Sequence, residues 1–179
     1  MKKQLIATLV GGLLLFIWQF LSFAAINFHK AESKYTPNQD KILEALSQNL
    51  TEDGEYFVPQ APPGSSTEQM QAVMESSIGK PWATINYHGA MKGGMGMNML
   101  RGFLIDLIAA FLLTWMLMKF QTLTFQTALL TSMAVGFIGY LTIPYLSSIW
   151  YETSSVGYLI DVVGEWGLIG AWLGWWLTK

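Results

Sequence analysis

The sequence predicts an all-helical membrane protein: a four-helix transmembrane bundle, both termini cytoplasmic, with a small α+β extracytoplasmic insert. Of its 179 residues, 52% are hydrophobic and 12% are charged, and that charged share is roughly half the share of an average soluble domain. The charges are also unevenly spread, because residues 30–92 hold 13 of the 22 and the other 116 positions hold nine. A polar insert within a membrane protein accounts for both observations.

Four apolar stretches are long enough to cross a hydrocarbon core of about 30 Å, which takes roughly 20 helical residues. Each must be helical in lipid, because an open strand would leave backbone groups unpaired. The first stretch loosely fits a signal peptide, but its apolar run exceeds the usual length of about 7–15 residues, so we expect an uncleaved anchor. The four stretches are Leu5–Ile26, Met99–Met118, Phe125–Ile149 and Val156–Leu177.

The basic residues of the short flanks predict the orientation. With four crossings, Lys2, Lys3, Lys119 and Lys179 all lie on one side, and that side is cytoplasmic by the positive-inside rule. We therefore expect a multi-pass protein of the bacterial inner (cytoplasmic) membrane with residues 29–98 extracytoplasmic. The expected parts are a first transmembrane helix (1–28), the α+β insert (29–98) and a three-helix transmembrane unit (99–179) that packs with the first helix.

Turn residues and hydrophobic periodicity predict the elements of the insert. A helix is expected over Pro37–Asn49, a second short helix after a capping box of Ser66 and Gln69, and two pairing strands over Glu55–Pro59 and Trp82–Tyr87. Some sixty residues without disulfides bury too little surface to be robust alone. We expect the insert to lean on the bundle or on a partner; the alternative is a flexible loop with two transient helices.

Every predicted span contributes polar side chains to the half nearer the insert. Asp161 and Glu165, spaced i, i+4, share one helical face, and charges inside a membrane usually face the bundle interior or a cavity. Two interpretations stay open. One is a site that handles a proton or small cation, or clamps a cationic ligand. The other is a pair of Arg101 with an aspartate that fixes the register of two helices, with Glu165 protonated and hydrogen-bonded. The candidate cluster is Arg101, Asp106, Asp161, Glu165, Gln19 and Tyr140.

Small residues recur at four-residue spacing in the spans, at Gly170 and Gly174, at Ser132 and Gly136, and at Ala7 and Gly11. Such spacing lets helix backbones approach closely. The contacts are expected within the chain, with a dimer as the alternative.

A glycine- and methionine-rich run precedes the second span. Thioethers and imidazoles are soft ligands that suit Cu(I), and glycine would let the loop wrap an ion. The alternative is that methionine is a pliable apolar filler at the membrane interface. The candidate Cu(I) ligands are His88, Met91, Met95, Met97, Met99 and His29.

Other classes of function are excluded or disfavoured. The chain has no cysteine, which excludes disulfides, zinc–thiolate sites and iron–sulfur clusters. A net charge of −2 without a basic cluster argues against nucleic acid. Nucleotide-binding, metalloprotease and hydrolase motifs are missing, so we expect no enzyme, no catalytic residue and no cofactor apart from the candidate Cu(I).

The layout resembles an uncharacterised family of small bacterial four-helix inner-membrane proteins with an extracytoplasmic insert after the first helix. That family carries no assigned activity, so the resemblance implies topology rather than chemistry, and the methionine run is not part of it. The residues that carry the resemblance are Trp18, Ser22, His29, Leu46, Gly54–Pro59, Gly102–Leu107, Leu159–Asp161, Trp166 and Gly167–Trp176.

Together these features favour an accessory or scaffold protein, in contact with lipid, that acts on a protein partner or as a homo-oligomer. The alternative is a carrier or sensor of a small cation or proton that uses Asp106, Asp161 and Glu165. A further alternative is extracytoplasmic Cu(I) binding by the methionine-rich loop.

Overall fold

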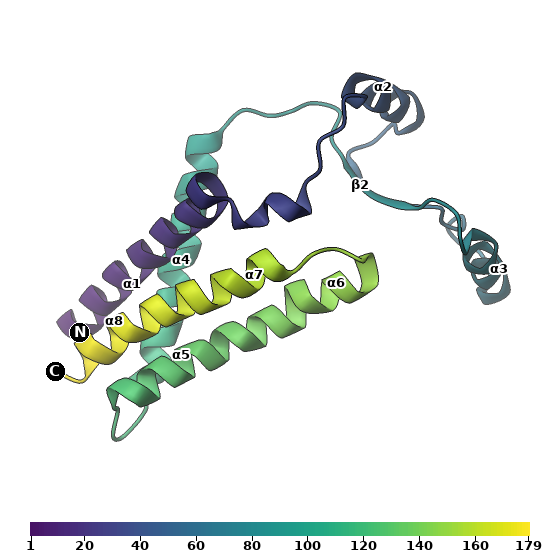
Figure 1. Ribbon diagram of the computed structural model, residues 1–179. Coiled ribbons are helices and arrows are strands. Elements are labelled where there is room, and N and C mark those ends of the chain that lie inside the picture. The colour runs from purple at the N-terminus through teal and green to yellow at the C-terminus, as the bar shows by residue number, and fades with distance from the viewer. The chain divides into compact units, whose positions relative to one another are not determined.

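The computed structural model describes all 179 residues, which form two units: Met1–Lys34 with Gly94–Lys179, here the helical unit, and Tyr35–Gly93. The chain is mostly helical and has one two-stranded sheet (Figure 1). The helical unit contains α1 (Lys2–Phe20), η1 (Leu21–Ile26), η2 (Phe28–Glu32), α4 (Met95–Leu117), α5 (Phe125–Tyr140), η3 (Leu141–Tyr145), α6 (Leu146–Tyr151), α7 (Val156–Asp161), η4 (Val162–Trp166) and α8 (Gly167–Leu177).

Four continuous helical stretches are long and apolar enough to cross a membrane: Lys2–Ile26, Met95–Leu117, Phe125–Tyr151 and Val156–Leu177. The prediction of a mainly helical chain with four helices long and apolar enough to span a membrane is confirmed. The second span begins four residues earlier than expected. Gly94, with φ at 132°, precedes it, and glycine tolerates this backbone conformation, so the helix starts at once and takes in Met95, Met97 and Met99.

Consecutive spans pack in two pairs, α1 with α4 and α5 with α8, and the contact of α1 with α8 joins the pairs. Small residues make these approaches possible: a Cβ on Gly11 of α1 would lie 3.1 Å from Ile169, and one on Gly170 of α8 would lie 2.8 Å from Ser132 of α5. The small-residue positions therefore meet within the chain. The core at these contacts consists of Ala7, Leu15, Ala110, Leu113, Leu117, Ala128, Ile169 and Leu173.

Three of the four spans contain a π-helical segment, η1, η3 and η4. Pro144, inside η3, has no N–H to donate and disfavours regular α-helical bonding. All three segments lie toward one end of the spans, where the first span finishes at Ile26 and the fourth begins at Val156. This is called the Ile26 end below. Because π-helical segments are frequent at functional sites, we expect a functional site at the Ile26 end.

The Tyr35–Gly93 unit contains α2 (Gln39–Asn49), β1 (Gly54–Val58), α3 (Thr67–Ser77) and β2 (Ala83–Tyr87). The strands pair antiparallel, as predicted, with Gly54 opposite Tyr87. The capping box is confirmed, because Ser66 and Gln69 bond each other's backbone N–H groups. The helix predicted from Pro37 begins at Gln39 instead, since the preceding turn has the Asn38 N–H bonded to the Thr36 hydroxyl at 3.3 Å.

The close approach of α5 and α8 can be tested with Gly170→Ala. Its Cβ would lie 2.8 Å from the Ser132 Cβ and 3.2 Å from the Leu129 Cα, and such overpacking costs about 1–3 kcal/mol. We expect earlier unfolding in an SDS titration followed by tryptophan fluorescence. Gly139→Ala on α5 is the matched control, because nothing lies within 4 Å of its added methyl group; equal stability of the two variants would contradict the packing.

Candidate functional site

A buried histidine is the centre of the Ile26 end. After η1, Asn27 takes a left-handed conformation (φ 57°), and the short helix η2 follows with His29 buried at 7% exposure. The His29 Nε2 lies 2.7 Å from Oδ2 of Asp161, and its Nδ1 lies 2.8 Å from Oε1 of Glu32. Phe23 stacks on the imidazole with ring centroids 3.8 Å apart. The histidine is thus held between two carboxylates and an aromatic ring.

The Asp161 carboxylate receives two more hydrogen bonds from the first span. The Trp18 Nε1 donates to Oδ1 at 3.0 Å, and the Ser22 hydroxyl donates to the same oxygen. Trp18 and Ser22 are four residues apart, so they lie on one side of their helix. A buried carboxylate is stable only when it is paired and hydrogen-bonded, and Asp161 meets this condition. Glu32, His29, Asp161, Ser22 and Trp18 are called the His29 clasp below.

Two glycines of the fourth span make room for the clasp. A Cβ on Gly157 would lie 2.8 Å from the His29 Nδ1 and 2.9 Å from Oε1 of Glu32, and a Cβ on Gly164 would overlap the Trp18 indole. Glycine at both positions therefore lets η2 and the first span approach the fourth span. The hydrogen bonds of Trp18 and His29 to Asp161 join residues 143 and 132 positions apart in the chain.

The clasp favours a doubly protonated His29. Burial alone would lower the pKa of His29, but the hydrogen bonds to Asp161 and Glu32 and the charges of both carboxylates outweigh it, and the pKa is raised above 6.5. With both nitrogens facing carboxylates, the ring offers no free lone pair to a metal or to a substrate proton. Ser22 donates to Asp161 rather than to the imidazole, so this serine and histidine do not form a nucleophile–base pair.

A cavity of about 280 Å³ lies beside the clasp, within the helical unit. Glu165 and Asp161 both line it, together with Gln19 of the first span and Tyr140 of the third. The Tyr140 hydroxyl is 3.1 Å from the Ser155 hydroxyl. Four of the six polar residues expected to converge therefore line one hollow, which is open on one side.

Asp106 of α4 is hydrogen-bonded to Gln19. It is 3% exposed; its Oδ1 accepts a hydrogen bond from the Gln19 Nε2 at 2.9 Å, and its Oδ2 is buried with no hydrogen-bond partner. Gln19 thus links this carboxylate to the cavity. The buried orphan oxygen is a polar group that the fold leaves unsatisfied.

Arg101 does not join the cluster. Its side chain is exposed, and the ion pairs of the structure all involve histidines. The expected Arg101 pair that fixes helix register is therefore wrong, because His29 takes the role of the cation. Sequence reasoning missed Glu32 and the His29–Asp161 contact. The available signal was the i, i+3 spacing of His29 and Glu32 directly after a span.

The candidate copper ligands are divided between the two units. His88 and Met91 belong to the Tyr35–Gly93 unit, whereas Met95, Met97 and Met99 begin α4 with exposed side chains. Both nitrogens of His29 face carboxylates, and no group of three or more His, Asp or Glu side chains is arranged to hold a metal ion. Copper binding by the thioethers stays a prediction.

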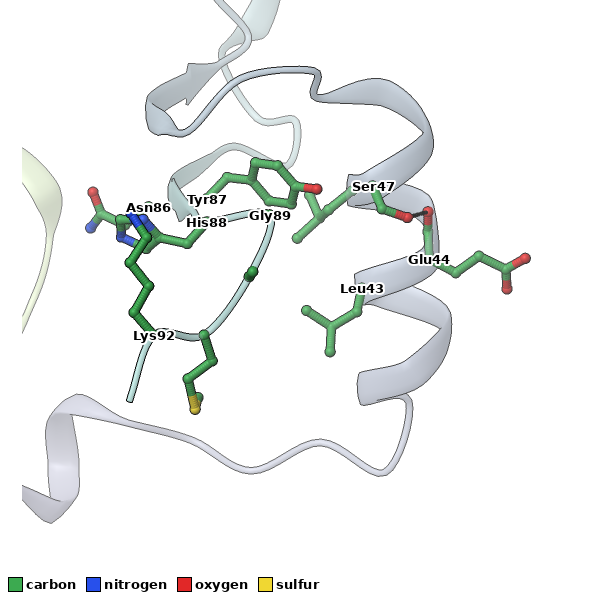
Figure 2. A pocket seen from close by; sticks show the side chains of 11 residues that line it. Leu43, Glu44, Ser47, Asn86, Tyr87, His88, Gly89 and Lys92 are labelled. Carbon is green, nitrogen blue, oxygen red and sulfur yellow. Dashed lines mark hydrogen bonds between the residues drawn. The ribbon is translucent and has the colours of Figure 1, made fainter. Parts of the chain in front are cut away.

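The Tyr35–Gly93 unit has an open groove of about 810 Å³ between α2 and the segment that follows β2 (Figure 2). Leu43 and Leu46 of α2 form one wall, and Tyr87 and Met91 belong to the other. Asp53 holds the second wall: the Gly89 N–H donates to its Oδ1 at 2.9 Å, and this bond lowers the pKa of Asp53. The groove is mostly apolar and open to solvent.

Comparison of the chain with protein-family models, curated proteins and solved structures finds no match. The family resemblance based on individual residues therefore stays a prediction. The geometry of the Ile26 end and of the groove carries the functional argument.

The raised pKa of His29 predicts a pH-dependent stability. A group whose pKa is raised on folding stabilises the fold fully below its unfolded value, here 6.5, and this stabilisation is lost as pH rises through the folded-state pKa. We expect the difference in melting temperature between the natural chain and His29→Gln, measured in detergent, to shrink as pH rises from about 6 to about 9.

His88→Gln is the matched control for this measurement. The side chain of His88 is 70% exposed, and its contact with the exposed Asp53 is long, at 3.7 Å. Its substitution should therefore leave the pH dependence of the melting temperature unchanged. A melting-temperature difference for His29→Gln that stays constant over this pH range would show that the clasp is not charged as described.

Proposed function

We propose that this protein is an integral-membrane accessory protein of the bacterial inner membrane that binds a protein partner through its Tyr35–Gly93 unit. The observation that carries the proposal is that this unit has no buried residue, although it has two helices and a sheet. A two-stranded sheet is marginally stable in water at best. Folded elements without a core are expected where a partner supplies the missing apolar contacts.

Exposed apolar side chains support this proposal. Leu43 and Met91, which both line the groove, are 59% and 100% exposed. Single exposed apolar residues are ordinary, but contiguous ones mark interaction sites. The groove gathers Leu43, Leu46, Tyr87 and Met91 on one concave surface, and buried anchors in concave pockets supply most of the binding energy in protein interfaces.

Charge indicates the chemistry of the partner. Residues 35–93 hold three lysines and seven Asp and Glu, a net charge of −4. Complementary potentials speed association and suppress wrong partners. A partner segment with apolar side chains and a net positive charge therefore suits the groove best. A second copy of this chain would bring the same negative charge and suits it less.

The proposed orientation places both termini and the α4–α5 loop in the cytoplasm, and the Tyr35–Gly93 unit outside. It is supported by Lys2, Lys3, Lys119 and Lys179 in the flanks that share one side of a four-span topology, according to the positive-inside rule. Lys119 and Lys179 also lie over the Trp115 and Trp175 rings, where interfacial aromatic residues are expected.

The absence of cysteine makes this orientation testable with single-cysteine variants. We expect Ser76→Cys, on α3, to react in intact cells with a membrane-impermeant maleimide, because it would face outward. Thr122→Cys, in the α4–α5 loop, should react only after the membrane is permeabilised. The reverse labelling pattern would overturn the proposed orientation.

The groove predicts which substitutions abolish partner binding. Leu43→Gln combined with Met91→Gln removes two groove side chains that are 59% and 100% exposed, so the substitutions should disturb few contacts within the unit. In mild-detergent purification of the full chain after chemical cross-linking in cells, we expect the cross-linked partner to be lost or reduced at least about tenfold, as for the removal of an interface anchor.

Met74→Gln combined with Ile78→Gln is the matched control, because these residues are equally apolar and exposed but do not line the groove. It should retain the partner. A groove variant that retains the same cross-linked proteins, or a natural chain that yields none, would contradict the proposed function. If the cross-linked partner is a second copy of this chain, the groove serves self-association and not a positively charged partner.

A further inference from the structure

We infer that the cavity beside the His29 clasp binds an organic ammonium group, with Glu165 as its counter-ion and aromatic rings as its walls. This site lies in the helical unit and is independent of the groove discussed above. Its volume of about 280 Å³ exceeds what a bare ion fills and is close to the lower limit for small-molecule pockets.

The charge balance around the cavity favours a cationic ligand. Asp161 is hydrogen-bonded by Trp18, Ser22 and His29. His29, the cation of this cluster, is therefore already paired with Asp161. Glu165, which lines the cavity, forms no ion pair, and the side-chain donor that reaches it is Gln19, which also donates to Asp106. A carboxylate without a cation in a buried position is costly, and a bound cation would offset the cost.

The orphan oxygen of Asp106 is a second, independent observation. Asp106 is 97% buried, and its Oδ2 has no hydrogen-bond partner. Its other oxygen is held by Gln19, whose side chain also lines the cavity. Asp106 itself does not line the cavity but is joined to its wall through Gln19, so a positive charge in the cavity would stabilise this carboxylate as well as Glu165.

The remaining walls select an organic cation over a metal ion. Phe23, Tyr140, Tyr158 and Trp166 line the cavity, and the faces of aromatic rings attract ammonium groups. A hard metal ion would need six or more oxygen ligands, and no group of three His, Asp or Glu side chains is arranged for one. Carboxylate plus aromatic rings is the lining that recognises alkylammonium groups.

Titration of the purified full chain in a nonionic detergent tests the site directly. Tetramethylammonium chloride is the probe, with sodium chloride as the reference, and binding is followed by isothermal calorimetry. We expect saturable binding of tetramethylammonium beyond the sodium reference. Glu165→Gln, which keeps the shape of the side chain, should weaken the affinity about tenfold or more, the effect of removing a buried counter-ion.

Glu152→Gln is the matched control, because it removes the same charge from an exposed turn of the same unit outside the cavity. It should bind as the natural chain does. Heat equal to the sodium reference, or unchanged affinity in Glu165→Gln, would overturn the inference. If Glu165→Gln does not fold, the natural chain still decides: 3,3-dimethylbutanol, a neutral probe with a similar trimethyl head, must fail to compete with tetramethylammonium.

Two sources supply such a group: a free amine or the headgroup of an aminophospholipid. Nanodiscs of phosphatidylethanolamine and of phosphatidylglycerol distinguish them. If the headgroup is the resident ligand, tetramethylammonium should bind more weakly in phosphatidylethanolamine. Equal affinity in both bilayers assigns the site to a free amine, and no binding in either bilayer overturns the inference.

Discussion

The structure of the helical unit depends on one buried carboxylate, that of Asp161. A charge at this depth is tolerated only where donors converge on it, and here they come from Trp18, Ser22 and His29. Their positions in turn require the left-handed turn at Asn27 and the bare backbone at Gly157 and Gly164. The clasp therefore joins the first span to the fourth at the Ile26 end, while the Trp172 and Trp176 indoles donate to the Ala7 and Lys3 carbonyls at the other end.

The clasp also divides the carboxylates of the site into two kinds. Asp161 is paired and saturated with donors, so it serves the fold. Glu165 and Asp106 have no cation, and one oxygen of Asp106 has no partner at all. A buried charge without an opposite charge does not stabilise a fold. A bound ligand would explain why Glu165 and Asp106 lie in these positions.

The sequence predicted those features that depend on local patterns. The apolar runs defined the four spans, and Ser66 with Gln69 defined a helix start. The clasp was beyond reach, because His29 and Asp161 are 132 positions apart and meet only through a turn at Asn27 that no periodicity marks. Arg101 seemed the nearer cation, since it lies five positions from Asp106, but that spacing is about 140° around a helix, and its side chain is exposed.

The two units differ in what holds them together, and this difference supports an anchoring role for the helices. The helical unit has a continuous core of small and branched side chains, whereas no residue of the Tyr35–Gly93 unit is buried. A unit without a core cannot offset its ordering entropy by itself. In the function proposed above, tethering to a membrane would confine the unit with a partner in the same membrane, and confinement raises effective concentration without new contacts. A small apolar groove in a unit with a net charge of −4 would then suffice for selective binding, because the anchor would supply proximity and the groove would need to supply only specificity.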